Sequence, residues 1–233
     1  MEGLNATITL QLRENSLWLK PFLKVIIVVA CMPGKFIVLE GVDAAGKSLM
    51  AKELASFLEK KGFSVFLTAE PSKSDFGQKV RALLRSEHDP QKNARTFLDL
   101  YVNDRKIHLE KEILPALKKG KIVLCDRYKY STIVYQALQG IPVEKILSLH
   151  EKMLVPDLVL VLDVPLKVSL KRIEKSHRDG IDTFEQEKFL RQVRKKFLSL
   201  SSLLPKENIK VIGAAKPKKL VLAVLKKEVQ SLL

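Results

Sequence analysis

The sequence is poor in cysteine, with only Cys31 and Cys125 among 233 residues. Two cysteines cannot form the disulfide framework that stabilises many small secreted domains, so we expect a protein of the reducing cytoplasm. Cys125 lies in the apolar run 122–125, where a cysteine is more often a small core residue than a reactive thiol. A hydrophobic content of 46% over this length is enough to form the core of one large domain.

A long uncharged apolar run is also absent. The most apolar stretch near the N-terminus, residues 17–31, is interrupted by two lysines and a proline, and its uncharged part, residues 25–32, is far too short to span a bilayer. We therefore expect no association with a membrane. After residue 32 the chain shows no internal repeat and no low-complexity linker, which predicts a single domain.

Acidic residues are scarce relative to basic ones: 26 Asp and Glu oppose 41 Lys and Arg, for a net charge of +15. Proteins that bind nucleic acid often carry such a charge. However, the lysines of segments 167–175, 188–196 and 216–227 alternate with apolar residues at helical spacing, as on the solvated face of an amphipathic helix. We therefore expect no nucleic-acid partner, and a positive field that suits a polyanionic nucleotide.

The most informative motif is a phosphate-binding loop of the form G-x-x-x-x-G-K-[ST]. It follows a short β-type run at 35–40 and precedes a helical pattern at 49–61, which is the order that such a loop requires. Its glycines let the backbone curl so that successive N–H groups point inward, its lysine reaches the β- and γ-phosphates, and its serine offers a hydroxyl to Mg²⁺. We expect a nucleoside triphosphate to bind at Gly41, Val42, Asp43, Ala44, Ala45, Gly46, Lys47 and Ser48.

The loop also bears on the N-terminal stretch. Residues 28–31 resemble a lipoprotein cleavage site, but an enzyme that consumes ATP has no supply of it outside the cell. We therefore expect the functional domain to comprise residues 32–233. Residues 1–31 would then be an extension, or the result of a translation start assigned too early. N-terminal sequencing of the protein made from its native message distinguishes these cases from a mature chain that begins at Met1.

Short apolar segments alternate with helical patterns along the domain. Strands are predicted at 35–40, 63–68, 121–125, 157–164 and 208–212, and helices at 49–61, 76–86, 93–117, 133–139, 143–154, 165–175, 184–201 and 217–231. This alternation predicts an α/β protein of three layers, a five-stranded parallel sheet with helices on both faces. Ligands of such a fold bind at the carboxyl ends of the strands.

Several polar residues directly follow predicted strands. Asp126 stands where the carboxylate of a Walker-B motif stands, and with Ser48 it is a candidate to hold Mg²⁺, directly or through water. Arg127 beside it is a candidate to neutralise a second phosphate group, although a strand-end salt bridge explains an Asp-Arg pair equally well when it is considered alone. Further candidates at strand ends are Asp43 and Glu70, with Asp163 a weaker one.

Other signatures of P-loop proteins are absent. No Asn-Lys-x-Asp motif for guanine occurs, which argues against a GTPase, and no second glycine-rich loop or transporter signature indicates a motor or a transport ATPase. A regulatory or nucleic-acid-binding P-loop ATPase remains an alternative that would use the charge of +15. Salt-dependent DNA binding stronger than nucleotide binding would favour that alternative.

Further motifs stand in register with the phosphate-binding loop: Glu70-Pro71, Asn103-Asp104-Arg105, Asp126-Arg127-Tyr128 with Ser131-Thr132 and Tyr135-Gln136, and Asp182-Thr183-Phe184-Glu185. In order and spacing over about residues 35–200 the chain resembles the thymidylate kinase family. The resemblance implies a transferase of nucleotide biosynthesis that uses ATP and Mg²⁺ to phosphorylate dTMP to dTDP. It also implies a homodimer. Another nucleoside monophosphate kinase and a deoxynucleoside kinase are the alternatives among enzymes.

The resemblance assigns the contacts to the base. The aromatic ring at Tyr101 stacks on thymine, Arg105 contacts a thymine carbonyl, and Gln136 hydrogen-bonds the base edge. A flat apolar face and a set of donors and acceptors suit this base chemically. Tyr101 and Arg105 are also four residues apart, which places them on the same face of a helix.

The resemblance also assigns the contacts to the rest of the acceptor nucleotide. Arg81 and Arg127 hold the 5′-phosphate, which favours a monophosphate over a nucleoside as the acceptor. Asp43 lies near the 3′-hydroxyl and the phosphate, and Tyr135 packs against the sugar and disfavours a ribose 2′-hydroxyl. Glu70 belongs to the same substrate-binding set.

Phosphoryl transfer relies on positioned cations, since negative charge spreads over the transferred group in the transition state. The predicted catalytic residues are the cations Lys47 and Arg127 together with Asp43, and the resemblance implies a further arginine, which some family members carry inside the phosphate-binding loop. This chain has Ala44 there, so we expect the arginine in a short lid at about 172–183. Arg178, near the polar tip of that segment, is the first choice, and Arg172 is the second.

The chain departs from the family pattern at two places. Ala69-Glu70-Pro71-Ser72-Lys73 stands where the family often has Arg-Glu-Pro-Gly-Gly, which leaves the geometry of this substrate loop open. Asp99 and Asn103 lie in the helix that contacts the base, where small or apolar residues are common. The selectivity for dTMP over dUMP is therefore left open by the sequence.

Overall fold

The computed structural model describes residues 34–86, 93–174 and 183–233. The predictions for residues 1–31 and for Arg178 fall outside these ranges, as does most of the predicted lid. No helix among the described residues is long and apolar enough to cross a membrane.

Five parallel strands form one sheet in the order β2-β3-β1-β4-β5, which confirms the predicted fold class. The strands are β1 (Lys35–Glu40), β2 (Val65–Ala69), β3 (Ile122–Asp126), β4 (Leu158–Asp163) and β5 (Ile209–Gly213). The three inner strands β3, β1 and β4 are buried almost throughout, whereas the edge strands β2 and β5 are partly exposed. The near-continuous apolar sequences of β1, β3 and β4 reflect their burial, because an inner strand of a parallel sheet is covered on both faces.

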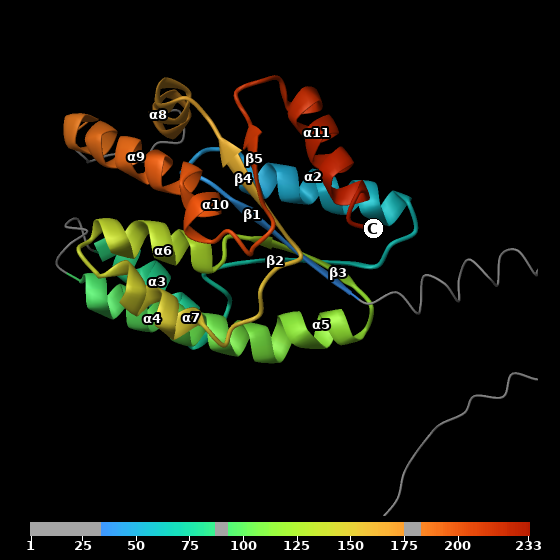
Figure 1. Ribbon diagram of the computed structural model, residues 1–233, viewed down its shortest axis with the longest axis horizontal. Coiled ribbons are helices and arrows are strands. Elements are labelled where there is room, and N and C mark those ends of the chain that lie inside the picture. Colours follow the sequence, from blue (N-terminus) through green and yellow to red (C-terminus); the bar gives the residue numbers. More distant parts are fainter. Residues whose placement is uncertain (1–33, 87–92, 175–182) are drawn as a thin grey trace, which may run out of the picture. The chain divides into compact units, whose positions relative to one another are not determined.

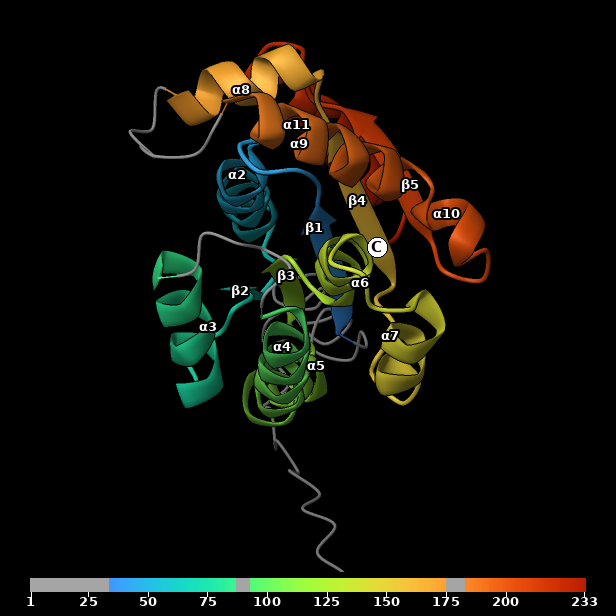
Figure 2. The same ribbon diagram turned by 90° about the vertical axis from the view of Figure 1, so that its left-hand side faces the viewer.

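Helices cover both faces of the sheet (Figure 1). They are α2 (Lys47–Lys60), α3 (Asp75–Ser86), α4 (Ala94–His108), α5 (Leu114–Lys118), α6 (Lys129–Leu138), α7 (Val143–His150), α8 (Leu166–Glu174), α9 (Thr183–Leu198), α10 (Leu200–Leu203) and α11 (Lys218–Gln230). Helices α2 and α11 pack together on one face, and α4, α5, α6 and α9 lie on the other (Figures 1 and 2). The core between the layers is built by the strands and the apolar faces of these helices.

The helix predicted at 93–117 is not a single regular α-helix. A π-helical turn, η1 (Leu109–Ile113), separates α4 from α5. Pro115 follows this turn and has no N–H to donate, and the ring of a proline in a helix collides with the carbonyl of the fourth residue before it. A wider turn at this point relieves that conflict. The predicted helix 143–154 likewise ends earlier, at His150, and the predicted helix 184–201 is divided into α9 and α10.

The strand register gathers the carboxyl ends of the inner strands at one edge. Asp126 at the end of β3 lies beside Leu39 of β1 and Ala69 of β2. The phosphate-binding loop leaves β1 one residue later and leads into α2. In Figure 2 this loop lies beneath α8 and α9. The residues predicted to bind phosphate, metal and acceptor therefore start from neighbouring strands.

Candidate active site

The phosphate-binding loop has the backbone that its glycines allow. Gly41 and Gly46 have φ angles of 135° and 98°, a region that residues with a side chain rarely adopt. A Cβ atom on Gly41 would also lie 2.4 Å from the carbonyl oxygen of Leu162. Ala44 is in the left-handed region too, with φ 59°. At Gly41 the loop therefore packs against β4 too closely for a residue with a side chain.

The Lys47 side chain lies inside the loop. It is buried, and its Nζ donates hydrogen bonds to the carbonyl oxygens of Gly41 and Val42 at 2.9 and 2.8 Å. Burial, together with the charge of Arg127, lowers the pKa of Lys47 to about 8, although nearby carboxylates oppose the shift. An anionic phosphate in the loop would favour the charged ammonium. The ammonium group of Lys47 thus lies inside the loop that is predicted to bind the triphosphate.

Ser48 and Asp126 meet across the start of α2 and the end of β3. The Ser48 hydroxyl donates a hydrogen bond to Oδ2 of Asp126, while the buried Oδ1 of Asp126 has no hydrogen-bond partner among the described residues. A hydroxyl and a carboxylate are ligands that suit Mg²⁺, which usually takes one or two protein oxygens and completes its shell with phosphates and water. The described residues contain no cluster of three or more His, Cys, Asp and Glu that could hold a metal by itself.

Arg127 occupies the turn between β3 and α6 in an uncommon backbone conformation, with φ 73°. Its guanidinium forms a salt bridge with Asp43, donates from Nη1 to the Ser131 hydroxyl at 3.1 Å, and lies 5.9 Å from the ring centroid of Tyr135. Burial alone would lower the pKa of Arg127, but Asp43 and neighbouring acidic groups raise it. The structure therefore brings the predicted acceptor residues Asp43, Arg127 and Tyr135 together, with a permanent positive charge at their centre.

The loop after β2 explains how the chain accommodates its departure from the family pattern. The carboxylate of the buried Asp104 in α4 accepts hydrogen bonds from the backbone N–H of Ser72 at 2.7 Å and from the hydroxyls of Ser72 and Ser74. Arg81 of α3 donates to the carbonyl oxygens of Pro71 and Ser72. Serine hydroxyls thus hold a loop for which the family often uses glycines, and Arg81 is bound to its backbone.

Arg105, a predicted base contact, lies in a buried polar network. It is 1% exposed and donates to Oε2 of Glu70 from Nε at 2.8 Å, to the Thr132 hydroxyl at 3.1 Å and to Nε2 of His150 at 2.6 Å. Glu70 also accepts from His108, at 3.2 Å. Glu70 therefore lies behind Arg105, from where it orients and neutralises that side chain.

The remaining predicted base contacts come from α4 and α6. Tyr101 packs its ring on Phe97, with centroids 6.3 Å apart and planes 26° apart, and burial raises its pKa to about 12. Gln136 is buried, and its Nε2 donates to Gln139 at 3.1 Å, while its Oε1 and the hydroxyl oxygen of Tyr135 meet no partner within the part of the chain that the structure describes. Both side chains thus keep acceptor capacity in a buried setting.

Helix α8 also contacts the phosphate-binding loop. The Ser169 hydroxyl donates to the carbonyl of Asp43 at 2.8 Å, and Nη1 of Arg172 donates to the carbonyl of Ala44 at 3.1 Å, with Ala45 at 3.4 Å. Arg172 therefore lies against Ala44, the loop position at which, by the resemblance, some members of the thymidylate kinase family carry an arginine. Arg178 lies outside the described residues, so its prediction stays untested.

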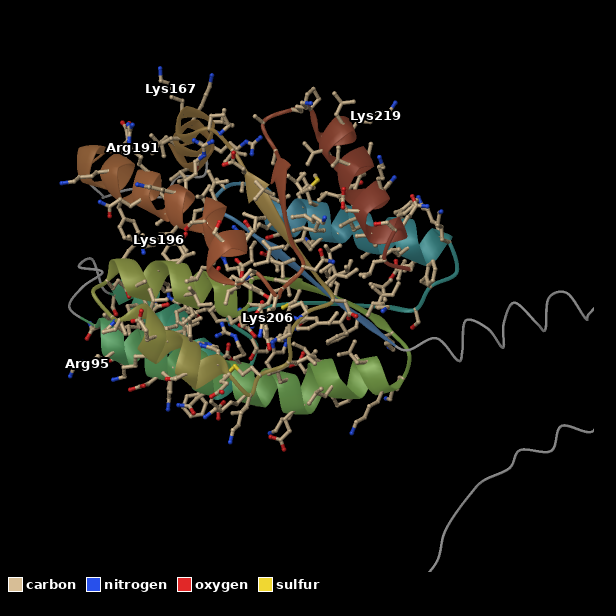
Figure 3. The ribbon with its side chains drawn as sticks, in the orientation of Figure 1. Arg95, Lys167, Arg191, Lys196, Lys206 and Lys219 are labelled. Carbon is tan, nitrogen blue, oxygen red and sulfur yellow. The ribbon has the colours of Figure 1, made fainter. Side chains whose placement is uncertain are left out.

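Asp163, the weaker candidate, is held by another partner. At the end of β4 it accepts from Nε and Nη2 of Arg194 in α9, at 2.6 and 2.9 Å. This bidentate salt bridge attaches α9 to the sheet. The basic side chains labelled in Figure 3 come from α4, α8, α9, the turn before β5, and α11, and so are spread over several elements.

Sequence reasoning assigned no role to several residues that organise the site, among them Glu40, His150 and Thr132. Glu40, the last residue of β1, binds the first turn of α6, and His150 binds Arg105. Thr132, also on α6, was part of the family resemblance but had no role assigned to it. The position of Glu40 at a strand end, directly before the loop, is the one signal that could have indicated it.

In comparisons with known proteins, the matching family model and the similar proteins carry the same family name. The family model described as "Thymidylate kinase" matches residues 39–224. A protein of Desulfotalea psychrophila named "Thymidylate kinase" is 41% identical over 169 residues, which cover 72% of this chain and 83% of that protein. A protein of Pyrococcus horikoshii named "Probable thymidylate kinase" is 39% identical over 182 residues, with 76% of this chain and 88% of that protein covered.

Proposed function

This chain belongs to the thymidylate kinase family, and from that premise we propose that it transfers the terminal phosphoryl group of ATP to dTMP, giving ADP and dTDP. The reaction places the protein among the phosphotransferases of nucleotide biosynthesis. The phosphate-binding loop serves the donor, and the residues after β2, on α4 and on α6 serve the acceptor.

One observation carries the proposal beyond membership of the family. Within the described ranges, the buried side-chain oxygens and nitrogens that lack a hydrogen-bond partner are Oδ1 of Asp126, the hydroxyl oxygen of Tyr135 and Oε1 of Gln136. Buried polar atoms are normally paired, and leaving one unpaired costs about 1–3 kcal/mol. These three belong to the residues predicted to face the metal, the sugar and the base. A bound nucleotide with Mg²⁺ would supply their partners.

The proposed mechanism uses positioned charge. Lys47 turns from the carbonyls of Gly41 and Val42 to the β- and γ-phosphates, and the N–H groups of the loop hold the remaining oxygens. Mg²⁺, held by Ser48 and Asp126, would neutralise charge on the donor phosphates. On the acceptor side, Arg127 and Arg81 hold the phosphate of the monophosphate, with Asp43 orienting Arg127 through their salt bridge.

The acceptor nucleotide is bound between α4 and α6 in this proposal. Tyr101 offers a flat face to thymine, and the partnered guanidinium of Arg105 fixes the donors near a base carbonyl. Gln136 contributes the base-edge hydrogen bond, and Tyr135 packs against the sugar. Glu70 acts through Arg105, because its carboxylate is occupied by Arg105 and His108.

A panel assay tests the function. ADP formation is measured by coupled enzymes with ATP, Mg²⁺ and each common deoxy- and ribonucleoside monophosphate, and with thymidine itself. We expect dTMP to give the highest kcat/KM. The Lys47→Ala variant should lower the rate by orders of magnitude, whereas Lys60→Ala, at the exposed end of the same helix, should not. Phosphorylation of thymidine but not of dTMP would replace the proposal with a deoxynucleoside kinase.

We also propose that the active form is a homodimer and works in the cytoplasm. The dimer rests on the family resemblance, and sedimentation at micromolar concentration should give about twice the chain mass of 26.4 kDa. The cytoplasm is supported by the need for ATP and by Cys125, which is buried as a free thiol. A monomer that retains full activity would contradict the first of these two proposals.

A further inference from the structure

Glu40 is a buried carboxylate that the mechanism above does not use. It is the last residue of β1, is 0% exposed, and directly precedes the phosphate-binding loop. One of its oxygens, Oε1, accepts from the backbone N–H groups of Tyr128 and Ser131 at 2.8 and 3.1 Å, and the other, Oε2, accepts from the Ser131 hydroxyl at 2.7 Å. Burying a carboxylate costs free energy, and here three hydrogen-bond donors offset part of that cost.

The contacts of Glu40 with Tyr128 and Ser131 lie next to Arg127, whose backbone conformation is strained. Arg127 has φ 73°, a conformation that costs a non-glycine residue roughly 1–2 kcal/mol. Three hydrogen bonds bracket it: its own N–H donates to Leu39 at 2.9 Å, the Cys125 thiol donates to its carbonyl at 3.0 Å, and the next N–H, that of Tyr128, donates to Glu40. Glu40 therefore helps to maintain the turn that aims Arg127.

The Ser131 hydroxyl extends this effect to the guanidinium. It donates to Glu40 and accepts from Nη1 of Arg127 at 3.1 Å, so that the carboxylate fixes the direction of its lone pairs. The other terminal nitrogen of the guanidinium, Nη2, forms the salt bridge with Asp43 of the phosphate-binding loop. Arg127 is thus held by Asp43 of the phosphate-binding loop and, through Ser131, by Glu40, the residue directly before that loop.

A purely structural role for Glu40 would be that of a cap for α6. Its contacts with the two backbone N–H groups fit such a role, since both belong to the unpaired donors at the start of a helix. The contact through Oε2 does not, because it reaches a side chain whose other partner is Arg127. That second contact is what separates the two roles experimentally.

We propose that Glu40 is a positioning residue, which orients Arg127 toward the acceptor phosphate through the Ser131 hydroxyl and so couples the donor loop to the acceptor site. The proposal rests on the function proposed above for Arg127. We call the hydrogen-bonded series Glu40, Ser131 and Arg127 the relay. Removing the Ser131 hydroxyl or the Glu40 carboxylate should weaken binding of the monophosphate and leave binding of ATP nearly unchanged.

The variants Ser131→Ala, Ser131→Thr and Glu40→Gln test the relay. Ser131→Ala removes the hydroxyl while Glu40 keeps both backbone contacts, so folding is expected to survive even if Glu40→Gln proves unstable. For Ser131→Ala we expect KM for the monophosphate to rise about tenfold, the scale of one hydrogen bond to a charged group, with KM for ATP within about twofold. Ser131→Thr, which keeps a hydroxyl, should restore most of the loss, and Ser148→Ala, an exposed serine on α7, serves as the control.

A double-mutant cycle with Arg127→Ala completes the test. In that background, Ser131→Ala and Glu40→Gln should change KM for the monophosphate no further, since the relay has lost its target. Equal effects on both substrates, or a lower melting temperature with unchanged KM values, would overturn the proposal in favour of a cap. The acceptor is the monophosphate that the panel phosphorylates fastest, so a preference other than dTMP would contradict the proposed function without affecting this test.

Discussion

At the scale of the residue, the candidate site depends on two arginines, the buried Arg105 and the partly exposed Arg127, that are oriented by other side chains. Arg105 and Arg127 each have an acidic partner and a hydroxyl partner, Glu70 with Thr132 and Asp43 with Ser131. Arginine suits this position because its charge is permanent and its planar fork is oriented by several hydrogen bonds at once. The spacing of Tyr101 and Arg105 was visible in the sequence, but these partners were not, since each comes from a different element.

His150 gives the residue scale a pH-dependent prediction. Its Nδ1–H donates to the carbonyl of Ile146 at 2.7 Å and its Nε2 accepts from Arg105, an arrangement that requires a neutral ring. Burial, and then the charge of Arg105, lowers the pKa of His150 to about 3. Below pH 6.5 the unfolded chain therefore takes up a proton that the folded chain does not, and stability falls as the pH falls toward 3.

The size of this effect follows from the two pKa values. Between pH 7 and pH 5 the histidine should cost about 2 kcal/mol of unfolding free energy. We expect His150→Gln, whose amide oxygen can still accept from Arg105, to lose about that much less than the wild type over the same interval. Urea unfolding of both proteins at the two pH values measures the difference. Parallel losses would show that His150 is charged in the folded state.

The arginine of the lid gives a second prediction at this scale. Arg172 lies against the loop at Ala44 and Ala45, whereas Arg178 was the first choice from the sequence. We now expect Arg172→Ala to reduce kcat by roughly a hundredfold or more with a smaller change in KM for dTMP, because a cation on the transferred phosphoryl acts in the transition state. Steady-state kinetics of Arg172→Ala and Arg178→Ala decide between them. A loss of kcat confined to Arg178→Ala returns the assignment to that residue.

At the scale of the element, the first turn of α6 and the loop after β2 hold the residues of the proposed acceptor site. Successive residues of α6, Ser131 and Thr132, bind the two arginines, and the loop is tied to α4 through Asp104. Periodicity predicted α4 and the later part of α6, at 133–139, because an amphipathic pattern is a property of the segment itself, but it missed the first turn of α6, which begins at Lys129. It did not predict the π turn within 93–117, although Pro115 was a signal for an irregularity there.

Gly77 supplies the prediction for the loop after β2. A Cβ atom at this position would lie 2.3 Å from the carbonyl oxygen of Ser72 and 2.9 Å from Oδ1 of Asp104. Gly77→Ala should therefore displace the loop, lower stability by about 1–3 kcal/mol and raise KM for dTMP, since Arg81 is bound to the same carbonyl.

A matched control exists on β5. A Cβ atom on Gly213 would meet no atom within 4 Å, so Gly213→Ala should leave stability and KM nearly unchanged. Thermal unfolding and steady-state kinetics of the two variants make the comparison. If both variants behave alike, the loop is not held as tightly as the contacts around Gly77 imply.

At the scale of the whole molecule, the order of the strands brings the two halves of the site together. Because β1 lies between β3 and β4, the phosphate-binding loop emerges beside the Asp126-Arg127 turn on one side and beside the end of β4 on the other. Asp43 and Arg127 are 84 residues apart in the sequence, and Glu40 and Ser131 are 91 apart, yet each pair hydrogen-bonds directly. The general rule for ligand sites in parallel sheets predicted the edge, but not these pairs.

A shortened chain tests the domain boundary that the sequence predicts. The family match covers residues 39–224, and every predicted site residue lies after residue 32. We therefore expect a protein of residues 32–233 to keep kcat and both KM values within about twofold of those of the full chain. The same coupled assay on both proteins measures this. A large loss of activity in a folded shortened protein would assign a catalytic or binding contribution to residues 1–31.

The sequence by itself determined the fold class, the order of the elements and the phosphate-binding loop. These are encoded locally, by hydrophobic period and by glycines and a lysine at fixed spacing. Only the tertiary structure decided which polar groups meet. Glu40 adjoins the loop in sequence but binds Ser131 on α6, and Arg172 lies against Ala44 from α8. Such pairings depend on which strands and helices become neighbours, and a local pattern carries no information about that.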